Sequence, residues 1–157
     1  MKIKLLCVGR TDVAWVKEGL ALYQGRIGRY TNFSVDEIPE LKGAASLTRE
    51  QIKEREGELI LKRVQPNQEL ILLDDKGKEY TSLDFASWLG ERLSRDSREM
   101  VFAIGGAYGF SREVYSRADL MISLSRMTFS HQMVRTIFAE QLYRAFTILR
   151  SEPYHHE

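Results

Sequence analysis

Cysteine is nearly absent from this sequence: Cys7 is the only one among 157 residues. A single cysteine excludes an internal disulfide and any zinc cluster built from several thiolates. Cys7 lies in the apolar segment formed by residues 3–8. We therefore predict that it is a small core residue rather than a reactive thiol.

Long apolar runs are missing as well. No stretch approaches the roughly 18 consecutive apolar residues that a membrane helix needs, and residues 3–8 are too short for the core of a signal peptide. We therefore expect a cytoplasmic protein. The net charge is only +1, which by itself does not indicate nucleic-acid binding. The first 30 residues hold six Lys or Arg against two Asp or Glu, which fits either a solvated helix face or a basic binding surface.

Two common nucleotide-binding signatures are also absent. The sequence contains neither the dinucleotide fingerprint G-x-G-x-x-G nor the phosphate-binding loop that ends in Lys, which argues against an enzyme that uses nucleoside triphosphates or dinucleotides. Of its three histidines, His155 and His156 are adjacent. Because no carboxylates accompany them at the spacing of metal ligands, we expect no metal site.

Short apolar segments alternate with longer segments of helical periodicity. This alternation predicts an α/β protein with a mostly parallel sheet flanked by helices. Without a linker or a repeat, residues 1–157 are predicted to form one domain. The predicted strands are residues 3–8, 33–38, 69–73, 100–104 and 120–124, and the main predicted helices are residues 13–29, 48–64, 83–94 and 131–150.

Several local signals predict where these elements begin and end. Asp12 and Ser82 are predicted to cap the helices that follow them, and Thr48 with Gln51 has the spacing of a capping box. Residues 74–78, Asp-Asp-Lys-Gly-Lys, are predicted to form a turn after the third strand.

The last third of the chain contains two strand ends that open into irregular backbone. The segment 105–109 is rich in glycine and the segment 125–130 is rich in hydroxyl groups, and each precedes a helix. In open α/β sheets, ligands bind in crevices at such strand ends. Gly105 and Gly106 would let the backbone approach a ligand closely, although from the residues alone a simple tight turn explains them equally well.

The long helix over residues 131–150 is apolar around most of its circumference. Such a helix must be covered on more than one side, and in a chain of this size one cover is predicted to be a second subunit. Within it, Arg135 and Glu140 interrupt apolar neighbours. Arg144 follows Glu140 by four residues, so the two are either an ordinary helix-surface ion pair or part of a site.

Several ordered motifs resemble the bacterial large-subunit ribosomal RNA pseudouridine-N3 methyltransferases, a family of the SPOUT class of knotted methyltransferases. The resemblance covers the whole chain and includes the final Tyr154 and His155, although His156 stands where the family usually has Arg or Lys. The motifs are Met-Lys-Ile-Lys-Leu-Leu-Cys-Val-Gly at 1–9, residues 72–77, Ile-Gly-Gly-Ala-Tyr-Gly at 104–109, residues 124–135, Glu-Gln-Leu-Tyr-Arg-Ala at 140–145 and residues 153–157.

The resemblance implies a trefoil knot formed by the C-terminal helix, a homodimer whose site uses both chains, and S-adenosyl-L-methionine as methyl donor. It implies that ribosomal RNA is the substrate, on the assembled ribosome, with no metal and no membrane involved. By this resemblance the donor-binding residues are Leu73, Gly105, Arg126, Met127, Thr128, Phe129, Ser130 and His131.

The same resemblance implies a reaction in which a methyl group moves to N3 of a pseudouridine. That nitrogen carries a weakly acidic proton, for which His131 and His155 are the candidate bases. Arg135 is a candidate electrostatic stabiliser, and Tyr154 belongs with His155 to a tail that closes over the site. The alternative is a non-catalytic, ribosome-associated or nucleotide-binding module that uses the same crevice.

Overall fold

The computed structural model describes residues 2–95 and 98–156, and its centre is a five-stranded sheet in the order β2-β1-β4-β3-β5. All four pairs of neighbouring strands are parallel, so the predicted α/β class with a mostly parallel sheet is confirmed. The trefoil knot stays a prediction. The strands are β1 (Lys2–Val8), β2 (Asn32–Ile38), β3 (Glu69–Glu79), β4 (Met100–Ile104) and β5 (Leu120–Ser123).

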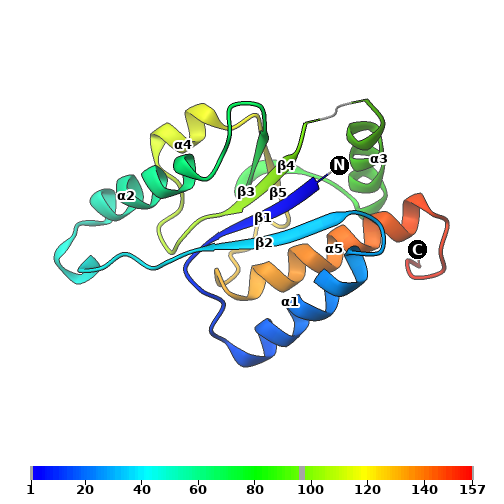
Figure 1. The fold of residues 1–157 in the computed structure, drawn as a ribbon, viewed down its shortest axis with the longest axis horizontal. Helices are drawn as coiled ribbons and strands as arrows, with labels where there is room; N and C mark the ends of the chain where they lie inside the picture. The colour runs from blue at the N-terminus through cyan, green and yellow to red at the C-terminus, as the bar shows by residue number, and fades with distance from the viewer. Residues whose placement is uncertain (1, 96–97, 157) are drawn as a thin grey trace.

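Helices cover both faces of this sheet (Figure 1). One face is covered by α1 (Ala14–Ile27), α3 (Ser82–Arg95) and α5 (Met133–Leu149), and the other by α2 (Arg49–Lys62) and α4 (Arg112–Arg117). A short 3-10 helix, Ala44–Ser46, precedes α2. Over the described part of the chain, no helix has the length and apolar character needed to cross a membrane.

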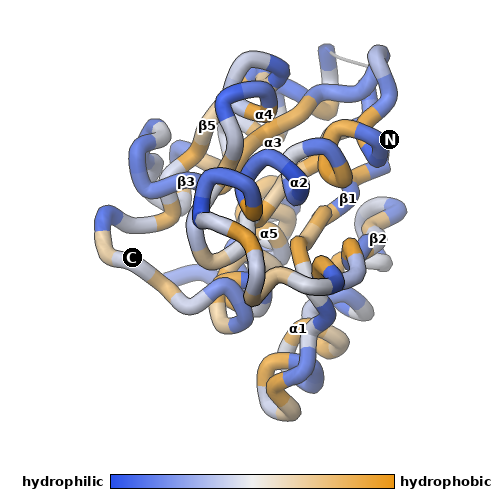
Figure 2. The backbone as a smooth tube through the Cα atoms, turned by 90° about the vertical axis from the view of Figure 1, so that its left-hand side faces the viewer, coloured by the Kyte–Doolittle hydropathy of each residue, from blue (hydrophilic) through white to orange (hydrophobic). Residues whose placement is uncertain are grey.

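The two faces of the sheet form two separate cores because neighbouring residues of a strand point to opposite sides. Cys7 and Phe102 pack with Phe138 of α5 on one side, whereas Leu6 and Leu72 belong to the core beneath α2 and α4. The central strands are therefore buried on both faces, as their continuous apolar sequences predict. Figure 2 shows the same pattern as hydrophobic segments running through the middle of the molecule.

The long helix α5 lies between α1 and α3 against the sheet (Figure 1). Its contact with α1 is close: Thr136 Oγ1 donates to the carbonyl of Val16 at 3.0 Å, and a Cβ at Gly19 would lie 2.8 Å from Thr136 Cγ2. A residue larger than glycine at position 19 would therefore push the two helices apart.

Two predicted helix caps are wrong. The residue before α1 is Val13, without a side-chain cap, and the backbone N–H of Asp12 donates instead to Gln132 Oε1. Before α3, Thr81 Oγ1 accepts from the N–H of Asp84, while Ser82 Oγ donates to Gln141 on α5. The Ser82 side chain thus contacts α5 instead of capping its own helix, and the backbone of Asp12 is bound by the residue before α5. The capping box at Thr48 is confirmed.

The turn predicted at residues 74–78 is also wrong, because β3 continues to Glu79. After Leu73 the register shifts, and β3 pairs with β5 a second time through Lys78 and Glu79. A Cβ at Gly77 would lie 2.7 Å from backbone atoms of Ile122 and Met121. Glycine is therefore required where the two backbones come closest.

Cys7 is fully buried, as predicted, and burial raises the pKa of its thiol to about 12. Only the thiolate is nucleophilic, so at pH 8 native Cys7 stays protonated and unreactive. We expect iodoacetamide to label the native protein at least about a hundredfold more slowly than the urea-unfolded protein, whose thiol has an ordinary pKa. Mass spectrometry of timed samples measures both rates. Equal rates would contradict the buried position.

Candidate functional site

A cavity of about 430 Å³ opens at the carboxyl ends of β3, β4 and β5. Three chain segments surround it. They are residues 73–75 of β3, the glycine-rich segment after β4, and the loop between β5 and α5. Its size is that of a small-molecule site. The lining residues are Leu73, Asp74, Asp75, residues 104–107, Gly109, Phe110, Leu124, Ser125, residues 127–131 and Val134.

The glycine-rich segment forms a tight loop on one side of the cavity. The N–H of Gly109 donates to the carbonyl of Gly106 at 3.1 Å, and Gly109 has a φ of 85°, which favours glycine. A Cβ at Gly105 would lie 3.3 Å from Phe110 Cε1 and 3.4 Å from the carbonyl carbon of Gly109. Because Phe110 and Gly109 also line the cavity, a side chain at position 105 would compete with a ligand for space.

The loop between β5 and α5 is braced by its own hydroxyl groups. Ser125 Oγ accepts from the N–H of Met127, and Ser130 Oγ accepts from the N–H of Met133 at the start of α5, both at 3.0 Å. Ser123 Oγ donates to the carbonyl of Ser125 at 2.9 Å. These hydrogen bonds hold the loop in an open curve along the cavity.

The charges around the cavity are acidic. Asp74 and Asp75 line it, whereas none of the lining residues is Lys or Arg. Tyr115 donates its hydroxyl to Asp74, and burial together with this hydrogen bond raises the pKa of Tyr115. Glu56 of α2 lies behind the glycine loop, where burial raises the pKa of its carboxyl group. The cavity therefore suits a ligand with a positive charge better than an anion.

The structure brings most of the predicted donor-binding residues together. Leu73, Gly105 and residues 127–131 all line the cavity. Arg126 does not: its side chain is 84% exposed, and its Nε lies 3.9 Å from Glu79 Oε1. Asp74 and Asp75 also line the cavity without being among the predicted donor-binding residues, although their position directly after the buried strand segment could have indicated them.

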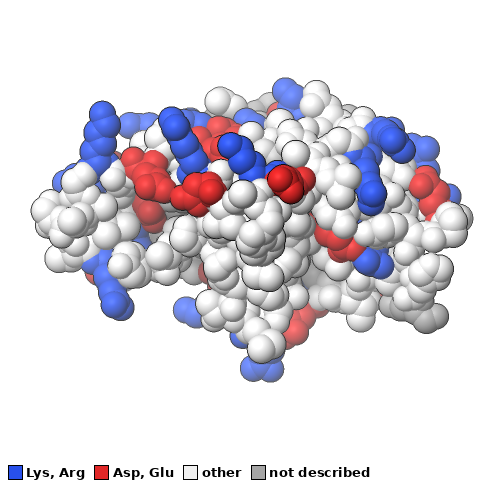
Figure 3. All heavy atoms as spheres, turned by 90° about the horizontal axis from the view of Figure 1, so that it is seen from below, with Lys and Arg blue, Asp and Glu red and all other residues white. Residues whose placement is uncertain are grey.

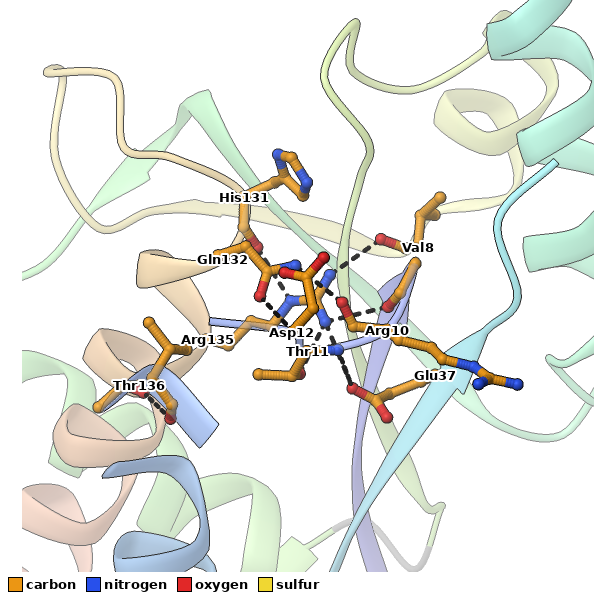
Figure 4. Close-up of polar contacts among 11 residues, drawn as sticks. Val8, Arg10, Thr11, Asp12, Glu37, His131, Gln132, Arg135 and Thr136 are labelled. Atoms are coloured by element: carbon orange, nitrogen blue, oxygen red, sulfur yellow. Dashed lines mark hydrogen bonds and ion pairs between the residues drawn. The ribbon is translucent and has the colours of Figure 1, made fainter. Parts of the chain in front are cut away.

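Arg135 lies close to His131 but does not line the cavity. It is fully buried, and all three guanidinium nitrogens donate hydrogen bonds (Figure 4). Nε donates to the carbonyl of His131 at 2.9 Å, Nη2 donates to the carbonyl of Val8 at 2.9 Å, and Nη1 donates to the carbonyl of Gly9 at 3.0 Å. The guanidinium thus connects α5 to the end of β1.

Tyr154 and His155 belong to the tail that follows the C-terminal end of α5 (Figure 1), whereas the cavity is lined by residues at the start of α5. The Tyr154 hydroxyl donates to Glu140 Oε1 at 3.0 Å, and Arg144 Nη1 lies 3.0 Å from His155 Nδ1. Arg144 also forms an ion pair with Glu140 and stacks over the Tyr154 ring, 4.8 Å from its centroid. The 17 residues of α5 span about 25 Å, so within one chain these tail residues and His131 do not meet.

No metal centre is found in the part of the chain that the structure describes, where no three His, Cys, Asp or Glu residues gather as possible ligands.

Known proteins are similar in sequence to this chain over its whole length. The family model described as "Predicted SPOUT methyltransferase" matches residues 1–155. A protein of Parabacteroides distasonis named "Ribosomal RNA large subunit methyltransferase H" is 50% identical over 157 residues, the full length of both chains. Proteins of the same name from Christiangramia forsetii and Trichlorobacter lovleyi are 50% and 47% identical over 156 residues, with at least 99% of each chain covered. The chain therefore belongs to the SPOUT methyltransferase family.

Proposed function

We propose that this protein transfers a methyl group from S-adenosyl-L-methionine to N3 of a pseudouridine in large-subunit ribosomal RNA, on assembled ribosomes in the cytoplasm. The observation that carries the proposal is the cavity at the ends of β3, β4 and β5, whose charged lining residues, Asp74 and Asp75, are acidic. The names of the relatives, which describe methyltransferases of large-subunit ribosomal RNA, support the choice of substrate.

The lining of the cavity fits this methyl donor. Leu73, Leu124 and Phe129 offer apolar contacts for a base, and Gly105 leaves backbone groups accessible for hydrogen bonds. When bound, the donor supplies a methyl group attached to a positively charged sulfur. Asp74 and Asp75 favour that charge electrostatically, and no lining cation opposes it.

The chain's own residues must supply the remaining chemistry. N3 of the pseudouridine must lose its proton as the N–CH₃ bond forms and the S–CH₃ bond breaks, which leaves a neutral thioether. His131 lines the cavity and is our candidate to accept that proton. Holding the two reacting atoms in line also lowers the barrier, since proximity and orientation supply roughly 7 to 11 kcal/mol in favourable cases.

We further propose that the protein works as a homodimer in which the tail of one chain closes the cavity of the other. Tyr154 and His155 lie a helix length away from the cavity of their own chain, so a second copy is the natural source of a tail. Uncovered apolar side chains on α1 and at the two ends of α5 support such an interface, with Trp15 58%, Met133 43% and Leu149 40% exposed. Figure 3 shows a broad uncharged area on this side of the molecule.

The test is transfer of a labelled methyl group from S-adenosyl-L-methionine to ribosomes from cells that lack this protein, followed by mass mapping of the RNA. We expect one new methyl group on a large-subunit pseudouridine. Donor binding by calorimetry without any transfer would support the alternative, a non-catalytic module. Absence of both binding and transfer would refute the donor assignment.

A further inference from the structure

The loop between β1 and α1, residues 9–12, is fixed to the start of α5 by side chains of α5 and the residue before it (Figure 4). Arg135 Nη1 donates to the carbonyl of Gly9 at 3.0 Å and to Thr11 Oγ1 at 2.8 Å. Gln132 Nε2 donates to the carbonyl of Arg10 at 2.8 Å, and Gln132 Oε1 accepts from the N–H of Asp12 at 3.0 Å. Each residue of the loop thus has a hydrogen bond to Arg135 or Gln132.

A further contact fixes the same loop to β2. The N–H of Thr11 donates to Glu37 Oε2 at 2.5 Å, and Arg135 Nη1 lies 3.4 Å from the same oxygen. Glu37 is therefore engaged by the loop backbone and by a buried cation. The Glu37 carboxylate therefore neutralises part of the positive charge of the buried Arg135, not the charge of an exposed side chain.

Arg10 differs from its neighbours in this loop. Its backbone is held by Gln132, but its side chain is exposed and extends away from the cluster (Figure 4). Within residues 2–95 and 98–156, its guanidinium has no hydrogen-bond or ion-pair partner. An unpaired cation on an immobilised backbone is ready to bind an anion, because less conformational freedom remains to be lost on binding.

The backbone of Arg10 lies next to a segment that lines the cavity. Gln132, which binds the Arg10 carbonyl, directly follows His131, which lines the cavity. Arg10 itself does not line the cavity, so an anion bound by its side chain lies outside the space for the methyl donor. The anion that must come to this edge of the sheet during the proposed reaction is the RNA backbone.

We propose that Arg10 binds an RNA phosphate next to the target nucleotide, and that Gln132 and Arg135 are positioning residues that hold it there. This inference rests on the proposed function. Contacts of this kind orient the nucleic acid without reading its sequence. The arrangement also explains why Arg135 is buried, because its guanidinium links the loop that carries Arg10 to the helix that follows the donor-binding loop.

The first test compares Arg10→Ala with Lys62→Ala. Lys62 is an exposed cation at the C-terminal end of α2, so both variants lose one surface charge. We expect Arg10→Ala to raise KM for ribosomes roughly three- to tenfold and to reduce the slope of log KM against log salt by about 1. The affinity for S-adenosyl-L-methionine and kcat should be unchanged, Lys62→Ala should behave as wild type, and Arg10→Lys should restore most of the loss.

The second test asks whether Gln132 acts through Arg10. Gln132→Ala removes the two hydrogen bonds that hold the loop and leaves the charge of Arg10 in place. We expect it to raise KM for ribosomes, whereas the double variant should be no worse than Arg10→Ala alone, since the two side chains serve one contact. Additive losses would show that Gln132 acts independently.

The results also separate this inference from the proposed function. If wild-type protein methylates ribosomes and Arg10→Ala does so with unchanged KM and salt dependence, the inference is wrong and the proposed function stands. If Arg10→Ala weakens binding of the methyl donor instead, the anion is the donor's carboxylate and not RNA. If wild-type protein transfers no methyl group, the proposed function itself fails.

Discussion

Gly105→Val is expected to abolish binding of S-adenosyl-L-methionine, with a loss of affinity of about a hundredfold or more, because the new side chain fills space next to the donor. Its Cβ would already lie within 3.4 Å of Phe110 and Gly109, so its two methyl groups must enter the cavity or displace the loop. Calorimetric titration of the variant with the donor measures the effect, and methyl transfer should disappear with it.

The matched control is Gly25→Val on α1. A Cβ at Gly25 has no heavy atom within 4 Å, so the same side chain is added at an open position. This variant should bind the donor with wild-type affinity. Thermal unfolding of both proteins checks that the sheet is intact. If a folded Gly105→Val protein binds the donor with wild-type affinity, the donor does not bind in this cavity.

Deletion of residues 154–157 is expected to leave donor binding intact and to reduce turnover to background. The cavity is complete without the tail, since Tyr154 and His155 lie beyond the far end of α5. Calorimetry and the methyl-transfer assay measure the two properties separately. If the truncated protein has normal turnover, the tail takes no part in the reaction. If it no longer binds the donor, the tail contributes to the donor site.

Mixing the two defective proteins tests where the tail acts. Truncated chains keep a working cavity, and Gly105→Val chains keep a working tail. If each cavity is closed by the tail of the partner, a mixed dimer regains one complete site. Equal amounts that exchange freely should recover about a quarter of wild-type activity, because half of the dimers are mixed and each has one complete site of two. No recovery, with mixed dimers demonstrated by native mass spectrometry, would contradict closure by the partner's tail.

The features that the sequence predicts well are those with local or periodic causes. The strand over residues 100–104 has the predicted bounds, because five buried apolar residues are followed directly by Gly105 and Gly106. The cavity segments can be located in the same way, since irregular backbone at the ends of parallel strands gathers at one edge of a sheet. The individual residues that we propose to bind the donor come from the family motifs.

The features that the sequence does not predict depend on contacts between distant residues. Arg135 binds carbonyl groups of Val8 and Gly9, which are 127 and 126 positions away, and nothing in the helical pattern indicates these partners. The predicted cap at Asp12 fails because Val13 is the residue that precedes α1, and the backbone N–H of Asp12 is bound by Gln132, 120 positions away. The continuation of β3 past Gly77 likewise requires the backbone of β5.

The strand order also determines when the protein becomes active during its own synthesis. The first strand made, β1, lies inside the sheet and must pair with β4, about 100 residues later in the chain. At translation rates of roughly 5 to 20 residues per second, that partner follows roughly 5 to 20 s later. The loop at residues 125–131 and α5 emerge later still, and both are needed to complete the cavity. A nascent chain therefore lacks the complete cavity, our proposed donor site, until almost all of it has left the ribosome on which it is made.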